Sequence, residues 1–176
     1  GDRSFGLGNY GRTPLADVLP VELLLDGEEA DEATFQVQLT EEGARHPITR
    51  LVSEAEENGL WWQRLHALDG TNVPVRAKPD AAVLLAHPTH KDADGEPLPI
   101  LSVREVGEGR TMALTVDTSW RWSLSEAAQG RGNQVYLRFW KNSLRWLMKD
   151  STASRVTVET PRENYAVGEE VRVVVR

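Results

Sequence analysis

The chain has 176 residues, which is typical of one domain, and its hydrophobic content of 40% is enough for a core. A formal net charge of −7 at pH 7, without any basic stripe, argues against binding to a nucleic-acid backbone. The chain has no cysteine, which excludes disulfides, thiolate metal ligands and a cysteine nucleophile within it, and no apolar run reaches the roughly 20 residues of a membrane span.

The first residues are predicted to form a loop and a short helix. Gly6–Gly11 matches the pattern G-x-G-x-x-G, but no strand precedes it and Arg12-Thr-Pro separates it from any helix. A dinucleotide site needs both flanking elements, so a flexible loop is the better interpretation. Thr13 is predicted to cap a short helix that has Pro14 at its first position.

Two strands and a capped turn are expected next. Residues 21–25 have strand character, and residues 34–39 alternate apolar and polar side chains; the acidic residues 26–32 join the two segments as a solvated loop. Thr40 begins a capped turn. His46 precedes a proline and is therefore expected to be extended; it either orients a site or satisfies a backbone carbonyl.

The middle of the chain combines a tryptophan pair with a second buried strand. Residues 60–65 contain two adjacent tryptophans, expected in a lid or at the edge of the core. Residues 81–86 are predicted to form a buried strand after a linker-like segment, residues 74–79. Residues 87–96 contain two histidines and three acidic residues, but their spacing fits no zinc or calcium template. We expect a solvated connection there and no metal site.

The segment from Ile100 to Trp122 is expected to organise the fold. It reads as a strand to Val106, a glycine turn, and a second strand over residues 111–116 that is covered on both faces. Open α/β sheets carry their working residues just past such strands. The candidate pocket therefore consists of residues at this tip, with one histidine as an outside candidate: Asp117, Ser119, Trp120, Arg121 and His46. In the alternative interpretation Arg121 pairs with Asp117 and the tryptophans only fill the sheet edge.

The C-terminal part is predicted to contain one long helix and two strands. Residues 123–132 form a loop or a frayed helix, and residues 135–148 an amphipathic helix. Its broad apolar face is assigned to the core and consists of Phe139, Trp140, Leu144, Trp146 and Leu147. Residues 155–159 and 170–175 alternate as strands, either an edge hairpin or the opening of a β-sandwich. We therefore divide the chain into residues 1–150 and 151–176.

Several short sequence segments, taken in their order along the chain, resemble the glutamine amidotransferase-like domain of large, membrane-anchored bacterial proteins. They lie at residues 4–11, 13–20, 40–48, 78–85, 107–110, 117–122 and 139–147. The resemblance implies a class I amidotransferase-like, flavodoxin-like α/β sheet with flanking helices. It also implies that the first part of this sheet lies upstream, that a β-sandwich follows, and that the parent protein is anchored on the extracytoplasmic side of the cell envelope.

An active class I amidotransferase needs a cysteine nucleophile and a histidine oriented by a carboxylate. The chain has no cysteine, and Asp117-Thr-Ser-Trp occupies the place of the expected His-x-Glu pair. We therefore predict a module without catalytic residues, metal or cofactor, which serves binding or assembly at the cell envelope and has a small molecule or a protein as its partner.

Two alternatives stay open. The His-Pro-Ile phrase is similar to one in trehalose-utilisation-type proteins, so a hydrolytic or sugar-processing enzyme would require His46, Asp117 and Ser119 to converge. A purely structural spacer would have no pocket.

Overall fold

The centre of the structure is a four-stranded sheet with the strand order β3-β6-β7-β8. In this computed structural model the described residues are 9–23, 30–72, 75–92, 94–130, 132–150, 158–159 and 174–175. The strands of the central sheet are β3 (Gln38–Leu39), β6 (Ala82–Lys91), β7 (Pro97–Val106) and β8 (Gly109–Leu114). Two smaller pairs are formed by β1 (Val21–Leu23) with β5 (Val75–Ala77) and by β2 (Ala30–Phe35) with β4 (Leu68–Asn72).

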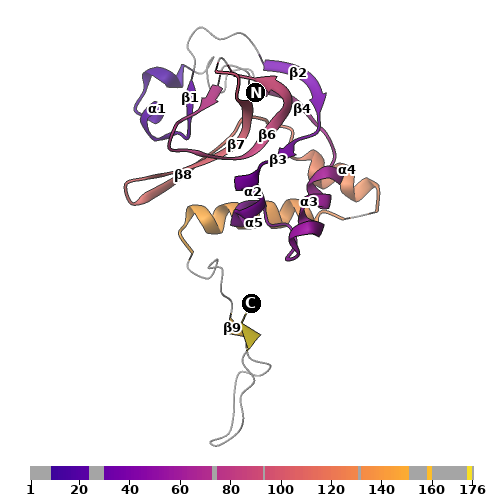
Figure 1. Cartoon of the computed structure of the whole chain (residues 1–176). Coiled ribbons are helices and arrows are strands. Elements are labelled where there is room, and N and C mark those ends of the chain that lie inside the picture. The colour runs from indigo at the N-terminus through magenta and orange to yellow at the C-terminus, as the bar shows by residue number, and fades with distance from the viewer. Residues whose placement is uncertain are drawn as a thin grey trace, which may run out of the picture.

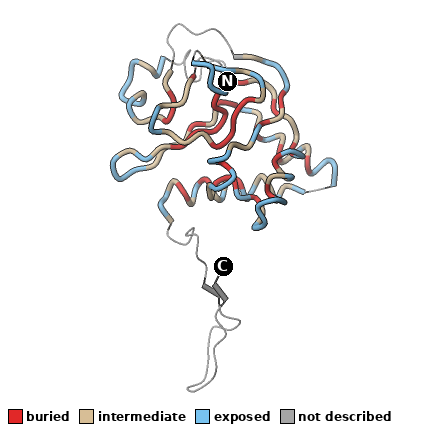
Figure 2. The backbone as a smooth tube through the Cα atoms, in the orientation of Figure 1, coloured by how far each residue is buried: buried red, intermediate tan, exposed pale blue. Residues whose placement is uncertain are grey.

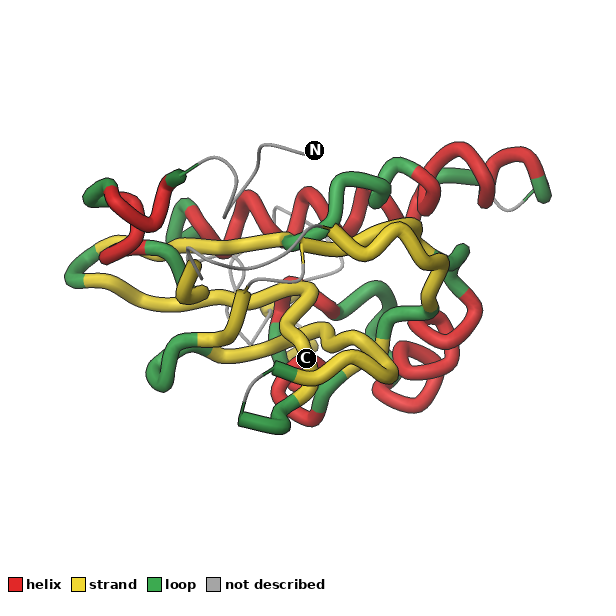
Figure 3. The backbone as a smooth tube through the Cα atoms, turned by 90° about the horizontal axis from the view of Figure 1, so that it is seen from above, coloured by secondary structure: helices red, strands yellow, loops and turns green. Residues whose placement is uncertain are grey.

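Helices α2 to α5 lie together below the strands in Figure 1, whereas α1 lies beside β1. The α-helices are α1 (Leu15–Val18), α2 (Glu41–Arg45), α3 (Ala55–Arg64), α4 (Arg121–Ala128) and α5 (Gln134–Leu147), and the 3₁₀ turns are η1 (Tyr10–Arg12) and η2 (Pro47–Thr49). Seen from above, the strands run roughly along the direction of the longest helix, α5 (Figure 3). The mixed α/β class is as predicted.

Every described strand pair is antiparallel. The parallel strand order of a flavodoxin-like sheet is therefore not seen among the described residues. The reason is local: β6, β7 and β8 follow one another through short turns, and short turns can join only antiparallel neighbours.

The predicted hairpin between β7 and β8 is confirmed. Val106 pairs with Gly109 next to the turn, and the ladder continues to Leu101 opposite Leu114. Gly107 has a φ of 55°, a left-handed conformation that glycine adopts without strain. The turn chemistry and the alternation of side chains therefore fix the register of this hairpin.

Two apolar clusters form the core, and the buried residues concentrate in and beneath the strands (Figure 2). The larger cluster lies between the sheet and α3, α4 and α5. The smaller one joins Val21 and Val75 of the β1–β5 pair to Leu98 and Ala113. Met112 and Leu114 pack against the larger cluster and Ala113 belongs to the smaller one, so both faces of β8 make apolar contacts, although Ala113 alone of the strand is buried.

Three buried aromatic rings form the centre of the larger cluster. Trp62 of α3, Trp122 of α4 and Phe139 of α5 meet edge to face, with ring centroids 5.4–6.2 Å apart. Their polar atoms are satisfied, because the Trp62 indole donates to the Thr49 carbonyl at 2.8 Å and the Trp122 indole to the His66 carbonyl at 3.0 Å. Edge-to-face packing with satisfied indoles is a stable arrangement for a core.

Several expected boundaries need correction. Residues 34–39 do not form one strand, because β2 ends at Phe35 and β3 begins at Gln38 in another sheet. For residues 123–132 the helical alternative holds, because most of α4 lies there, whereas the linker-like residues 74–79 contain β5. Leu144, which the sequence places on the core face of α5, is 55% exposed.

The C-terminal strands are described only at β9 (Val158–Glu159) and β10 (Val174–Val175), which pair antiparallel. This pairing is that of the predicted hairpin. The β-sandwich and the division after residue 150 stay predictions.

Candidate functional site

The predicted tip, residues 117–122, joins the end of β8 to β4. Thr118 uses one hydroxyl oxygen twice: it accepts from the backbone N–H of Asp69 at 3.0 Å and donates to the Asp69 carbonyl at 2.9 Å. Arg121 forms an ion pair with the Asp69 carboxylate. The tip therefore pins two segments of backbone together.

The candidate residues of the tip differ in exposure. Ser119 is buried, Asp117 is exposed, and Trp120, directly before α4, is 49% exposed. Arg121 pairs with Asp69 of β4, whereas the alternative interpretation pairs it with Asp117. Whether the tip binds a ligand stays a prediction.

His46 lies elsewhere, between α2 and the C-terminal half of α5. Its Nδ1 accepts from the backbone N–H of Ile48 at 3.2 Å, and its ring packs edge-on against Trp146 with centroids 5.3 Å apart. Burial, reinforced by the nearby charge of Arg110, lowers the pKa of His46 to about 4. His46 is therefore neutral at physiological pH and serves as the cap of η2.

His46 and the tip lie at opposite ends of β8. Arg110, the neighbour of His46, is the second residue of this strand, whereas Asp117 and Ser119 follow its end. A strand of this length spans roughly 17–20 Å. The Ser-His-Asp set required by the hydrolase alternative is therefore not assembled.

A second group of polar side chains lies at the end of β6. The sequence predicts a solvated connection after Ala86, but β6 continues to Lys91. His87 precedes a proline, which favours extended backbone, and it is only 3% exposed. The three acids that follow belong to a tight turn, in which the Asp92 carboxylate accepts from the backbone N–H groups of Asp94 and Glu96, each at 3.0 Å.

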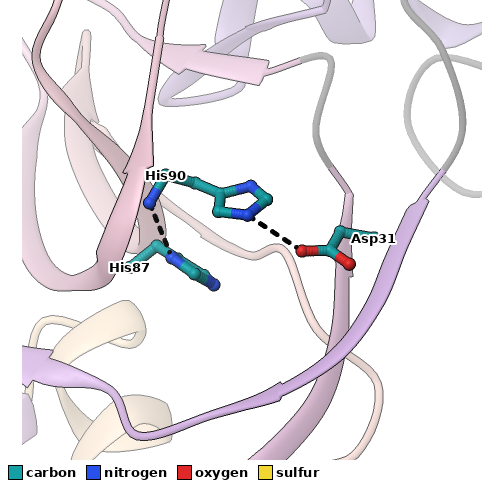
Figure 4. A group of neighbouring side chains, drawn as sticks. All are labelled: Asp31, His87 and His90. Carbon is teal, nitrogen blue, oxygen red and sulfur yellow. Dashed lines mark hydrogen bonds and ion pairs between the residues drawn. The ribbon is translucent and has the colours of Figure 1, made fainter.

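The cluster at this point consists of Asp31, His87 and His90 (Figure 4). One ligand atom from each residue lies within 4.8 Å of the other two. Asp31 comes from β2, which runs beside the end of β6, as the contact between the rings of Phe35 and His87 at 4.2 Å shows. His90 Nε2 lies 3.0 Å from a carboxylate oxygen of Asp31.

The two ring nitrogens of His87 are in different situations. Nδ1 accepts from the backbone N–H groups of His90 at 2.9 Å and Thr89 at 3.2 Å. Nε2 is buried and has no hydrogen-bond partner among the described residues. Because Nδ1 is an acceptor, the proton of the neutral ring lies on Nε2. A buried donor without an acceptor costs about 1–3 kcal/mol, so this atom is unexplained by the fold.

Burial lowers the pKa of His87, and the neighbouring His90 lowers it further, while the Asp31 carboxylate acts in the opposite direction. His87 is therefore neutral at physiological pH. Sequence reasoning missed this cluster, because Asp31 lies in a stretch of acidic residues that reads as a solvated loop. The only available signal was the pair of histidines three positions apart at the end of an apolar strand.

A groove of about 620 Å³ lies on another part of the same strand. It is bounded by the β1–β5 pair, the start of α2, β6 and the turn after β6. Six carboxylates line it, and among the described lining residues the only base is Arg76, which bonds to Glu22 at 2.5 Å and Asp94 at 3.0 Å. Its volume is in the range of small-molecule sites.

Comparison with known proteins identifies a family over most of the chain. Residues 5–149 match the family described as "Putative glutamine amidotransferase". No curated protein sequence matches the chain. In the part of the chain that the structure describes, no helix is long and apolar enough to cross a membrane.

Two solved structures are similar to this chain. The structure titled Cytoplasmic Protein STM1381 from Salmonella typhimurium LT2 has a TM-score of 0.59 and 25% identity, over 84% of this chain and 52% of that one. Cytoplasmic Protein STM3548 from Salmonella typhimurium has a TM-score of 0.57 and 24% identity, over 81% of this chain and 49% of that one. The chain thus spans about half the length of each of these proteins.

Proposed function

Because the chain belongs to the glutamine amidotransferase-like family, we propose that it is a ligand-binding domain of this family that does not hydrolyse glutamine. The chain has no cysteine, and a thiolate is the nucleophile of class I amidotransferases. The chemistry of the family is therefore absent from this part of the fold.

One observation carries the proposal: the residues that follow β8 bind Asp69 and so join the tip to β4. The resemblance implies a catalytic His-x-Glu pair at this place. Thr118 and Arg121 are there instead, and both are engaged with Asp69. A side chain that fixes two backbone segments is not free to transfer protons to a substrate.

The groove beside β6 is the proposed ligand site. Its six carboxylates outnumber its single guanidinium, so it favours a neutral or cationic small molecule over a phosphate or another anion. This feature separates the proposal from the spacer alternative, which requires no pocket. No observation favours the hydrolase alternative, because His46 lies far from Ser119.

The proposed function is independent of the compartment. The resemblance implies a parent protein at the cell envelope, whereas both similar solved structures are titled as cytoplasmic proteins.

The experiment combines a glutaminase assay with thermal melting of the 176-residue chain. No ammonia release from glutamine is expected. The ligand panel contains glutamine, neutral sugars, amines, peptidoglycan fragments and phosphates. A ligand at a hundred times its Kd is expected to raise the Tm by about 5–10 °C.

The matched variants are Ala81→Leu, which fills the groove, and Ala127→Leu on the exposed side of α4. Only Ala81→Leu should remove the ligand-induced shift. Ammonia release would contradict the loss of glutaminase activity. A melting temperature that no ligand changes would favour the spacer.

A further inference from the structure

We propose that Asp31, His87 and His90 form a binding site for a divalent transition-metal ion such as Zn²⁺. This site is separate from the groove, and the inference does not depend on the proposed function. Two imidazole nitrogens and one carboxylate oxygen are a common ligand set for this type of ion.

The first argument is the distance between the ligand atoms. His90 Nε2 and the Asp31 carboxylate are 3.0 Å apart, and one atom of each of the three residues lies within 4.8 Å of the others. In a tetrahedral zinc site with bonds of about 2.0–2.1 Å, neighbouring ligand atoms are roughly 3.3 Å apart. The three side chains therefore need only a small inward movement to surround an ion.

The second argument is the unpartnered Nε2 atom of His87. It is out of contact with solvent and has no partner among the described residues. The ring that carries it is held in place by its neighbours. Its centroid lies 4.2 Å from that of the Phe35 ring and 4.3 Å from that of the His90 ring, and two backbone N–H groups donate to its Nδ1. A nitrogen that is fixed, buried and unsatisfied within a group of three ligand atoms suits a metal ion.

Binding changes which nitrogen of the His87 ring carries the proton. Nδ1 of His87 accepts two hydrogen bonds, so Nε2 carries the ring proton in the metal-free protein. Histidine binds a metal as the neutral imidazole, so Nε2 gives its proton to solvent as its bond to the metal forms, and Nδ1 takes up a proton from solvent. Nδ1 is then a donor, and the backbone N–H groups of Thr89 and His90 release it; Asp31 supplies one negative charge to the ion.

The path for the ion lies on the side of His90 and Asp31. Their side chains are 38% and 24% exposed, whereas His87 closes the inner side. Three protein ligands leave a fourth position of a tetrahedral ion for water. The predicted site is therefore one that exchanges its metal with solvent.

The test uses the whole chain after treatment with a chelator, titrated with Zn²⁺ in a thermal melt and with Co²⁺ in a visible absorption titration. Saturating Zn²⁺ is expected to raise the Tm by about 5–10 °C, and Co²⁺ to give the absorption bands of a tetrahedral ion. The variants Asp31→Asn, His90→Gln and His87→Gln should each lower the metal affinity at least tenfold. His66→Gln, outside the cluster, should leave it unchanged.

Because His87 is buried, the metal affinity of its variant is interpreted only if the metal-free variant still unfolds cooperatively. Asp31 and His90 are partly exposed, so their variants decide the test in either case. The proposal is overturned if neither metal changes the wild-type chain. It is equally overturned if metal binding survives unchanged in both Asp31→Asn and His90→Gln, since the ion would then be bound elsewhere.

Discussion

Arg121, the first residue of α4, forms an ion pair with Asp69 of β4. The same aspartate accepts a hydrogen bond from Thr34 on β2 at 2.7 Å, and its backbone is held by Thr118. Asp69 thus links β2, β4 and the start of α4. These contacts hold the tip past β8, where the sequence predicts a pocket, in place.

Asp69→Asn is expected to destabilise the fold at neutral pH and to have less effect in acid. The hydrogen bond from Thr34, followed by the interaction with Arg121, lowers the pKa of Asp69. Because the pKa of Asp69 is lower in the folded than in the unfolded chain, the charged carboxylate stabilises the fold at pH values above the unfolded pKa of about 3.8. This stabilisation is lost as the pH falls through the folded pKa. Urea denaturation at pH 7 and pH 3 measures the difference, with Glu108→Gln in the exposed turn as the control. An equal loss at both pH values would contradict this role.

His46 is expected to make the fold sensitive to mild acid. Its pKa falls from 6.5 to about 4 on folding, mainly through burial. Between these two values the unfolded chain binds a proton that the folded chain does not, so the stability decreases as the pH is lowered from 6.5 to 4. With allowance for the partial exposure of the ring, the loss is about 2–3 kcal/mol.

His46→Asn is the variant that isolates this effect, because asparagine keeps the capping acceptor and does not titrate. Chemical denaturation at pH 7 and pH 4.5 should show a smaller pH-dependent loss in the variant than in the wild type. Parallel losses in the two proteins would rule out His46 as the titrating group.

Gly43→Ala is expected to destabilise the fold by about 1–3 kcal/mol, as overpacking does. A Cβ at this position of α2 would overlap the Leu84 carbonyl oxygen and lie 2.9 Å from Leu39 Cδ1. Gly59→Ala in α3 is the matched control, because its Cβ would have nothing within 4 Å; alanine there should be neutral or stabilising by up to about 1 kcal/mol. Thermal melting of the two variants compares them directly, and a neutral Gly43→Ala would mean that α2 can move away from β6.

Trp122→Phe is expected to cost about 2–3 kcal/mol. The substitution removes buried volume from the aromatic centre and leaves the His66 carbonyl without its indole donor. Trp120→Phe, two positions earlier and largely exposed, should change the free energy of unfolding by less than about 0.5 kcal/mol. If both substitutions cost the same, the two tryptophans would not differ in packing.

Local pattern predicted several elements of this protein correctly. The β7–β8 hairpin, the amphipathic α5 and the Thr40 cap of α2, whose hydroxyl accepts from the Gly43 N–H at 2.9 Å, all follow from residues close together in the chain. Hydrogen bonds and side-chain periodicity within such segments depend on nearby residues only. The sequence is therefore sufficient to predict them.

Only the tertiary structure decided which distant residues meet. The sequence contains many acidic residues that could pair with Arg121, and the tertiary structure places Asp69 next to it. In the sequence, Asp31 belongs to an acidic stretch predicted as a loop, and His87 to a segment predicted as a connection. In the structure β2 lies beside the end of β6, and this arrangement brings the two residues together. Strand adjacency depends on how whole apolar faces pack, and residue spacing along the chain carries no information about it.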